Sequence, residues 1–265
     1  MRKLCFALCA IIIACSGLAG CTKTDEPHSD PSCLRLTKIV ESGGIEYIFE
    51  YDSLNRLAYR WTHMEYPALP QYKYVYDNQG RLSQMIIAGF DFAIGGGFSK
   101  WHFYYYDNQG RIAGDTCYLG MDGIIGPDRP IYTSGIPMQY VTEYDTFQYD
   151  AQNRIISETH TYFDGRTFTR EFSYNAAGNR IGGGWMGDFE YDNKVNFNRT
   201  DPVLQFLHRD YSVNNLKIGD SYNAEGLPLV FPSNGKLHPL GNDWGIGGCT
   251  LTYACNPGRN RPSHH

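Results

Sequence analysis

The chain has 265 residues with 23 basic and 28 acidic side chains, and its formal net charge is −5. No basic run is longer than two residues, so the chain lacks the electrostatic footprint of a nucleic-acid-binding protein and we expect no such partner. Aromatic residues make up 15% of the chain, with 21 tyrosines. This surplus predicts outward-facing aromatic side chains. Such side chains suit carbohydrate or protein contact, or they simply line a tyrosine-rich sheet.

The first residues have the pattern of an export signal. Arg2 and Lys3 precede an apolar run over residues 4–14 that is too short for an ordinary membrane-spanning helix. Leu18-Ala19-Gly20-Cys21 follows and resembles the lipobox of bacterial lipoproteins. The resemblance implies a signal peptide over residues 1–20, cleavage before Cys21, and acylation of Cys21 with chains such as palmitate, which would anchor the protein to a membrane. The alternative is ordinary secretion with an incidental cysteine.

Residues 21–33 form a polar, acidic, proline-containing segment, and we expect a flexible tether. Lys23 followed by acidic residues resembles the surface-export signal of Bacteroidetes lipoproteins. That signal is short, so surface and periplasmic orientations both remain open.

One phrase recurs along the chain: Tyr-Asp, two spacer residues, Gly or Asn, Arg, and an aliphatic residue. Clear copies begin at Tyr51, Tyr76, Tyr106 and Tyr149, and looser ones begin at Tyr174 and Tyr222. Alternating aromatic and β-branched residues before each copy predict strands. An Asp or Asn that bonds to the backbone, followed by a residue tolerant of positive φ, predicts a hairpin turn. The turn-forming residues are Asp52, Asn55, Asp77, Gly80, Asp107, Gly110, Asp150, Asn153, Asn175 and Gly178.

A repeated calcium site is the alternative explanation of these aspartates. Calcium-binding β-helix arrays repeat about every nine residues, whereas the tyrosines here recur at long and uneven steps. We therefore interpret the phrase as a structural turn and assign no metal site and no cofactor.

The repeats predict an all-β domain over residues 34–255. We expect an antiparallel meander of roughly 12 strands, forming a large curved sheet or an open barrel. The Tyr-Asp turns would lie along one end and the Gly/Pro-rich loops along the other. Residues 119–139 predict a long loop, either functional or a surface excursion. One short helix is predicted near residues 202–208, with Asp201 as the cap and Pro202 at its first position. The tail over residues 256–265 is expected to be disordered.

Four of the eight cysteines lie in the first 21 residues, and Cys33, Cys117, Cys249 and Cys255 remain for the exported domain. Three pairings are possible in an oxidising compartment. Cys33 with Cys117 and Cys249 with Cys255 require the fewest assumptions. The second bridge requires the chain to bend, because six extended residues span about 20 Å.

The search for catalytic patterns finds none that is specific. His208-Arg209-Asp210 matches a kinase triplet without any other kinase motif. His63, His102 and His160 sit in strand-like segments and could converge on a metal, but we interpret them as separate strand residues. Carboxylates are plentiful, so a pair acting on a glycosidic bond stays an alternative. We expect a protein that is not an enzyme.

The repeats resemble the YD (RHS-type) repeat from about Tyr47 to Ile181. Residues 189–194, the short helix, Asn214-Asn215-Leu216 and Tyr222-Asn223-Ala224-Glu225-Gly226-Leu227-Pro228 then follow. This order resembles a Bacteroidetes lipoprotein family of unknown function with a large antiparallel, porin-like β fold. The resemblance implies a secreted or surface β protein and supplies no catalytic residues. Large RHS proteins build shells around toxins, and this chain has too few repeats for a closed shell.

Together these patterns predict a lipid-anchored β-repeat protein of the bacterial outer membrane, facing the periplasm or the cell surface. We expect it to contact the membrane through its lipid and to bind a glycan or an envelope protein without catalysis. The alternatives are a carboxylate-dependent glycan hydrolase and a purely structural envelope component.

Overall fold

The computed structural model describes residues 34–63, 70–88, 97–126, 129–181, 189–217, 219, 221–231 and 248–254. The predicted signal peptide, Cys21, the tether with Cys33, and the tail lie outside these ranges, as does much of the predicted Gly/Pro-rich loops. None of the helices in the described ranges combines the length and hydropathy needed to cross a membrane.

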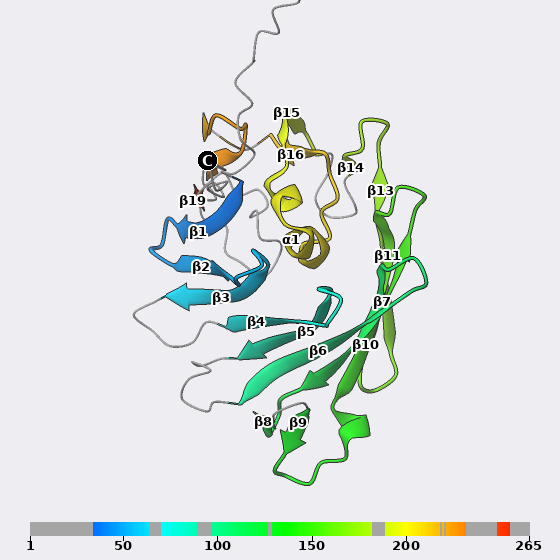
Figure 1. Cartoon of the computed structure of the whole chain (residues 1–265). Coiled ribbons are helices and arrows are strands. Elements are labelled where there is room, and N and C mark those ends of the chain that lie inside the picture. The colour runs from blue at the N-terminus through cyan, green and yellow to red at the C-terminus, as the bar shows by residue number, and fades with distance from the viewer. Residues whose placement is uncertain are drawn as a thin grey trace, which may run out of the picture. The chain divides into compact units, whose positions relative to one another are not determined.

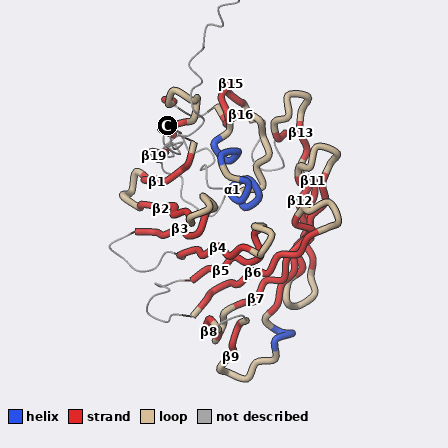
Figure 2. The backbone as a smooth tube through the Cα atoms, in the orientation of Figure 1, coloured by secondary structure: helices blue, strands red, loops and turns tan. Residues whose placement is uncertain are grey.

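Thirteen strands form one antiparallel sheet, so the predicted all-β fold is confirmed (Figures 1 and 2). The strands of this sheet are β1 (Arg35–Glu41), β2 (Glu46–Tyr51), β3 (Leu57–His63), β4 (Gln71–Tyr76), β5 (Leu82–Ala88), β6 (Phe98–Tyr106), β7 (Ile112–Leu119), β10 (Thr142–Tyr149), β11 (Ile155–Thr161), β12 (Thr167–Glu171), β17 (Ser221–Tyr222), β18 (Pro228–Phe231) and β19 (Cys249–Ala254).

The order of the strands follows the predicted meander over most of the sheet. Strands β1 to β7 and β10 to β12 lie beside their neighbours in sequence. Strand β19 departs from the meander, because this last strand of the sheet pairs with the first strand, β1. Ile39 faces Leu251 across this pair, and both side chains are buried. Short two-stranded ribbons complete the strands: β8 (Gly123–Ile125) with β9 (Pro130–Tyr132), β13 (Ser173–Tyr174) with β14 (Arg180–Ile181), and β15 (Tyr191–Val195) with β16 (Asn214–Leu216).

Each clear Tyr-Asp phrase forms a closed turn. Asp107 Oδ1 accepts the backbone N–H groups of Gln109 and Arg111 at 2.8 and 2.9 Å, and its Oδ2 accepts Arg111 Nε at 2.8 Å. Gly110, the fourth residue of the turn counted from Asp107, has a φ of 76°. The same bonds and the same left-handed residue recur at the turns that begin with Asp52, Asp77 and Asp150.

Consecutive copies are also tied to each other. The Tyr76 hydroxyl donates to the carbonyl of Leu57 at 2.7 Å, and the Arg56 guanidinium lies 4.2 Å from the centre of the Tyr76 ring. The pattern repeats from copy to copy at Tyr106, Tyr149 and Tyr174. Neighbouring Tyr-Asp turns therefore lie side by side along one end of the sheet.

The predicted helix forms as α1 (Pro202–Leu207), with a 3-10 helix, Phe197–Thr200, just before it. The Asp201 carboxylate accepts the N–H of Val203 at 2.7 Å and so caps it. The Phe206 ring packs edge-on against Tyr104 of β6 and Phe147 of β10. We call this helix-covered side of the sheet the inner face; it holds the main hydrophobic core (Figure 1).

The segment predicted as a long loop is more ordered than expected. Ribbon β8–β9 and a 3-10 helix, Met138–Tyr140, lie within residues 119–139 and just beyond them. Tyr132 of β9 packs on Phe98, which also contacts Trp101. Trp101 points to the opposite side from its neighbour His102, so the ribbon covers a second hydrophobic cluster on the outer face.

Cys117 and Cys249 are unbridged and buried, but the two predicted disulfides stay predictions, because the partner cysteine of each lies outside the described residues. Cys117 faces His102 on the inner face. Cys33 and Cys255 lie outside the described residues.

The left-handed turn position gives a first prediction. Gly110→Ala should lower the free energy of unfolding by about 1–2 kcal/mol, since an L side chain is strained at its φ of 76°. No atom lies within 4 Å of the added methyl group, so backbone strain is the cause. Urea denaturation measures the change. Gly43→Ala, also in open space but without positive φ, should be near neutral; equal losses in both variants would refute the explanation.

The turn carboxylates predict how stability depends on pH. The backbone N–H of Arg111, and after it the guanidinium of that residue, hold the pKa of Asp107 below its ordinary value of 3.8. A lowered pKa in the folded state means that this stabilisation is complete above 3.8 and is lost as the pH falls further. The difference in unfolding free energy between wild type and Asp107→Asn should therefore shrink below that pH. Asn108→Ala, which changes no charge, should differ from wild type by a constant amount; a constant difference for Asp107→Asn would contradict the prediction.

Candidate functional site

The inner face is apolar beside the Tyr-Asp turns and becomes polar farther along the strands. His102 of β6 lies opposite Cys117 of β7, which lies opposite Glu143 of β10. In the next row, Asp115 of β7 lies opposite Asp145 of β10, which lies opposite His160 of β11. Alternation along each strand places these side chains on one face.

All of these residues except Asp115 line a cavity of about 450 Å³. Strands β6, β7, β10, β11 and β12 supply its floor, and Leu207, His208 and Arg209 at the end of α1 contribute to its wall. Phe168 and Tyr162 add aromatic rings to the lining, and Arg170 and Lys100 add positive charge. This is the volume of a small-molecule pocket, and its lining is unusually polar for one.

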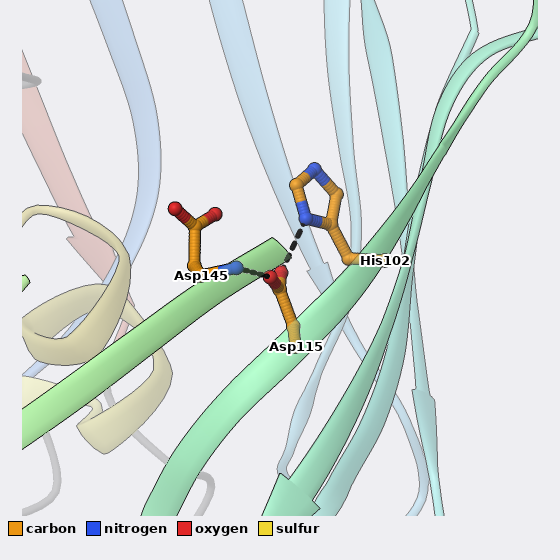
Figure 3. A group of neighbouring side chains, drawn as sticks. All are labelled: His102, Asp115 and Asp145. Atoms are coloured by element: carbon orange, nitrogen blue, oxygen red, sulfur yellow. Dashed lines mark hydrogen bonds and ion pairs between the residues drawn. The ribbon is translucent and has the colours of Figure 1, made fainter. Parts of the chain in front are cut away.

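His102 is the first of two histidines held by carboxylates. Its Nδ1 lies 2.5 Å from Asp115 Oδ2, and the other oxygen of Asp115 accepts the backbone N–H of Asp145 at 3.2 Å (Figure 3). Its Nε2 lies 3.6 Å from Cys117 Sγ. Burial disfavours the imidazolium, but the hydrogen bonds with Asp115 and Cys117 outweigh it and raise the pKa of His102 to about 10. The raised pKa favours the imidazolium form of His102.

His160 is arranged in the same way on the other side of the cavity. Its Nδ1 lies 2.8 Å from Asp145 Oδ1, and its Nε2 lies 3.6 Å from Glu143 Oε2. Lys100 Nζ is 3.8 Å from the same oxygen of Glu143. Burial, and then the nearby charge of Asp115, raise the pKa of Asp145 despite its bond to His160.

Arg209 closes the cavity from the helix side. It has a φ of 52°, and its guanidinium is 2.8 Å from Glu158 Oε1. The same group lies 4.5 Å and 4.3 Å from the ring centres of Phe147 and Phe206. Arg170 on β12 is a second, more distant partner of Glu158. The left-handed backbone at Arg209 thus turns the chain so that a cation lies between aromatic core and polar pocket.

Some of the residues singled out in the sequence line this cavity, and others have structural roles elsewhere. Two of the three strand histidines, His102 on β6 and His160 on β11, line this cavity. His63 is the last residue of β3. The kinase-like triplet is structural: His208 bonds Asn198, Arg209 bonds Glu158, and Asp210 accepts from Asn196 and Asn198. Asp52, Asp77, Asp107, Asp150 and Asn175 lie at hairpin turns away from this cavity.

A second cavity, of about 500 Å³, lies between the Tyr-Asp turns and α1. Its charged groups are committed to the fold, since Arg56, Arg81 and Arg111 each bind their own turn aspartate and cover a tyrosine. The polar cavity is the one in which titratable groups converge.

Sequence reasoning missed Asp115, Glu143 and Asp145, and it assigned Cys117 to a disulfide and not to a site. The repeat itself contained a signal for these residues. His102 and Asp145 each stand four residues before the tyrosine that begins a Tyr-Asp phrase. Cys117 and His160 each stand six residues after the arginine of such a phrase. The corresponding residues of the first two copies are Tyr47 and Tyr72, and Thr62 and Ile87. Superposing the copies would have revealed polar residues at equivalent inner positions.

No known protein-family profile and no curated protein sequence matches this chain. Among solved structures it is similar to a porin-like protein from Bacteroides uniformis ATCC 8492, at 14% identity, with 83% of this chain and 96% of that chain covered and a TM-score of 0.41. It is also similar to part of the TcdB2-TccC3-Cdc42 structure, at 14% identity and a TM-score of 0.27, with 73% of this chain covered. The match spans 11% of that much longer chain. No residue of the cavity takes a role from these similarities.

The partly buried ion pair of the cavity wall yields a stability prediction. Arg209→Met should cost about 3–5 kcal/mol in unfolding free energy, because Glu158 loses its close partner inside the wall. Adding Glu158→Gln should recover part of that loss. Arg166→Met at the exposed Asp164 pair should cost at most about 1 kcal/mol. Denaturant titration of the three variants checks this, and similar losses at both arginines would show that the wall pair is not special.

Proposed function

We propose that this chain is a cell-envelope binding protein that takes a saccharide in the polar inner-face cavity. The observation that carries the proposal is the lining of that cavity, which combines charged hydrogen-bonding groups with accessible aromatic rings. A sugar needs both, because its hydroxyl groups require donors and acceptors while the C–H face of its ring packs against aromatic carbon.

The aromatic component lies at the edge of the cavity. Phe168 exposes 53% of its surface and Tyr162 exposes 37%, and the Tyr162 ring packs edge-on against His160. Phe168 stands opposite His160 in the register of β11 and β12. An exposed ring beside buried polar groups therefore marks the entrance through which a flat, partly apolar ligand would enter.

The polar component lies deeper. Glu143 and Asp145 present acceptors, while Arg170 and Lys100 present donors within the same lining. Lys100 already pairs with Glu143, Asp145 holds His160, and Arg170 pairs with Glu158, so the positions of these groups are set before a ligand arrives. Preorganised polar groups reduce the entropic cost of binding.

The envelope location rests on the amino-terminal sequence. The basic start, the short apolar run and the lipobox-like ending at Cys21 support export and a lipid anchor. An anchored protein with a small polar pocket suits capture of glycan fragments at the cell boundary.

A carboxylate-dependent hydrolase is the second candidate. Donor atoms of Asp115 and Asp145 lie within 4.8 Å of each other, and the pKa of Asp145 is raised by burial and by Asp115, as in a general acid. Each carboxylate of the pair also holds a histidine, Asp115 through His102 and Asp145 through His160. A carboxylate that already holds a histidine is less free to act on a substrate, which favours binding over hydrolysis.

A glycan array on purified protein, followed by calorimetry with the best saccharide, tests the proposal. Phe168→Ala should weaken binding about tenfold or more, because the stacking surface is lost. Phe163→Ala is the matched control, since Phe163 also exposes 53% of its surface but does not line the cavity. Equal effects of the two variants, or an array without any binding, would refute the proposal.

Products distinguish the two candidates. If the bound saccharide is cleaved and Asp145→Asn abolishes cleavage without abolishing binding, the hydrolase replaces the binding protein. A partner recovered from envelopes that is a protein, and that Phe168→Ala still binds, would also count against a saccharide site.

A further inference from the structure

The two free cysteines in the described part of the chain have different neighbours. Cys249 lies opposite Glu41 in the register of β19 and β1, and burial, then the charge of Glu41, raise the pKa of its thiol to about 12. Cys117 lies opposite His102, and its Sγ is 3.6 Å from His102 Nε2. A neighbouring carboxylate opposes the loss of a thiol proton, whereas a neighbouring imidazolium favours it. Cys117 is therefore the cysteine whose surroundings favour reaction.

His102 is held in the orientation that this contact needs. Its Nδ1 lies 2.5 Å from Asp115 Oδ2, so its Nε2 is left to face the thiol. The other oxygen of Asp115 accepts the backbone N–H of Asp145 at 3.2 Å, which fixes the carboxylate in turn (Figure 3). A thiol, an imidazole and a carboxylate bonded in that order form the arrangement of nucleophile, base and orienting group that cysteine-dependent acyl transfer uses.

The thiol lies where a small substrate can meet it. Cys117 exposes 1% of its surface, yet it lines the polar cavity together with His102. Glu143 lies opposite Cys117 on β10, and its negative charge would oppose a thiolate. Lys100 Nζ is 3.8 Å from Glu143 Oε2 and offsets that charge. Positive side chains in the lining, such as Arg170, also favour the oxygen anion that forms when a thiolate attacks a carbonyl group.

The fold does not need a histidine or a cysteine at these positions. Tyr72 and Ile87, which occupy the equivalent places in the preceding hairpin, lie directly opposite each other in β4 and β5. Both pack against the main hydrophobic core. Replacing such a pair by His102 and Cys117 gives up apolar contact, and Asp115 is then buried beside them with 2% of its surface exposed. The three polar side chains thus form a group that stability alone does not explain.

We propose that Cys117 is the nucleophile of an esterase centre in this cavity, with His102 as its general base and Asp115 as the residue that positions His102. The substrate class is a small acyl ester. The activity goes beyond the proposed saccharide binding and does not depend on it.

The reaction has two steps. His102 takes the thiol proton, and the thiolate sulfur bonds to the ester carbonyl carbon; the raised pKa of His102 favours the resulting imidazolium. The carbon–oxygen bond to the alcohol then breaks, the alcohol oxygen takes the proton from His102, and the acyl group stays on Cys117 as a thioester. In the second step, water gives a proton to His102 and bonds to the acyl carbon, and the sulfur leaves and takes that proton. An ester and water become an alcohol and a carboxylic acid, so the reaction needs no oxidant or reductant.

The experiment uses purified protein with reduced thiols, no saccharide, and p-nitrophenyl acetate as the probe ester. Wild type should hydrolyse the ester with saturation, and mass spectrometry of the quenched reaction should find the acetyl group on Cys117. Cys117→Ser and His102→Gln should each lower kcat/KM at least about hundredfold. Cys249→Ser, at the other buried free cysteine, should leave kcat/KM unchanged.

The positioning role of Asp115 has its own measurement. Asp115→Asn should lower kcat at least about tenfold while KM stays the same, because an amide lets His102 adopt the wrong tautomer. A merely structural carboxylate would instead change the folded fraction, which circular dichroism measures, and would leave kcat per folded molecule unchanged. Asp164→Asn, at an exposed ion pair, should change neither kcat nor circular dichroism.

An absence of hydrolysis by the folded wild type would overturn the proposal. So would hydrolysis that survives Cys117→Ser, an acetyl group found only on another residue, or a disulfide at Cys117 in protein purified without a reductant. Because the assay contains no saccharide, its failure leaves the proposed function untouched, and failure of the glycan experiments leaves the ester reaction untouched.

Discussion

The bond from a tyrosine hydroxyl to a backbone carbonyl of the preceding copy is the interaction on which this structure depends. It joins Tyr76 to Leu57, Tyr106 to Leu82, and so on along the sheet, and the preceding arginine covers each ring. These bonds fix the register between one hairpin and the next. Because side chains along a strand alternate between the two faces, fixing the register also fixes which residues of every copy face inward.

The polar cavity follows from this alternation of inward- and outward-facing residues. Equivalent inner positions hold Tyr47 and Tyr72 in the first copies but His102 and Asp145 in the later ones. The backbone framework is the same, so substitution at inner positions converts an apolar face into a polar one without changing a turn. The repeat supplies the framework, and the departures from it at inner positions supply the polar groups of the cavity.

Features encoded locally were predictable from the sequence. The Tyr-Asp turns and the capped helix depend on residues within a few positions of each other, such as Asp201 and Pro202, and both have the expected form. Long-range features were not predictable. The pairing of β19 with β1 and the ribbon over Trp101 join segments far apart in sequence, and no local pattern distinguishes them. The cavity required the copies to be superposed, because its histidines lie more than fifty residues apart along the chain.

The balance of charge in the cavity argues that it was not selected for stability. Buried ion pairs seldom stabilise a fold more than well-packed apolar residues of similar size, and removing one partner is costly. The first copies show that apolar or aromatic side chains fit these inner positions, as Tyr72 and Ile87 do. Asp115 and Glu143 are almost fully buried beside histidines and a free thiol, at an expected cost to stability that the proposed saccharide site would explain.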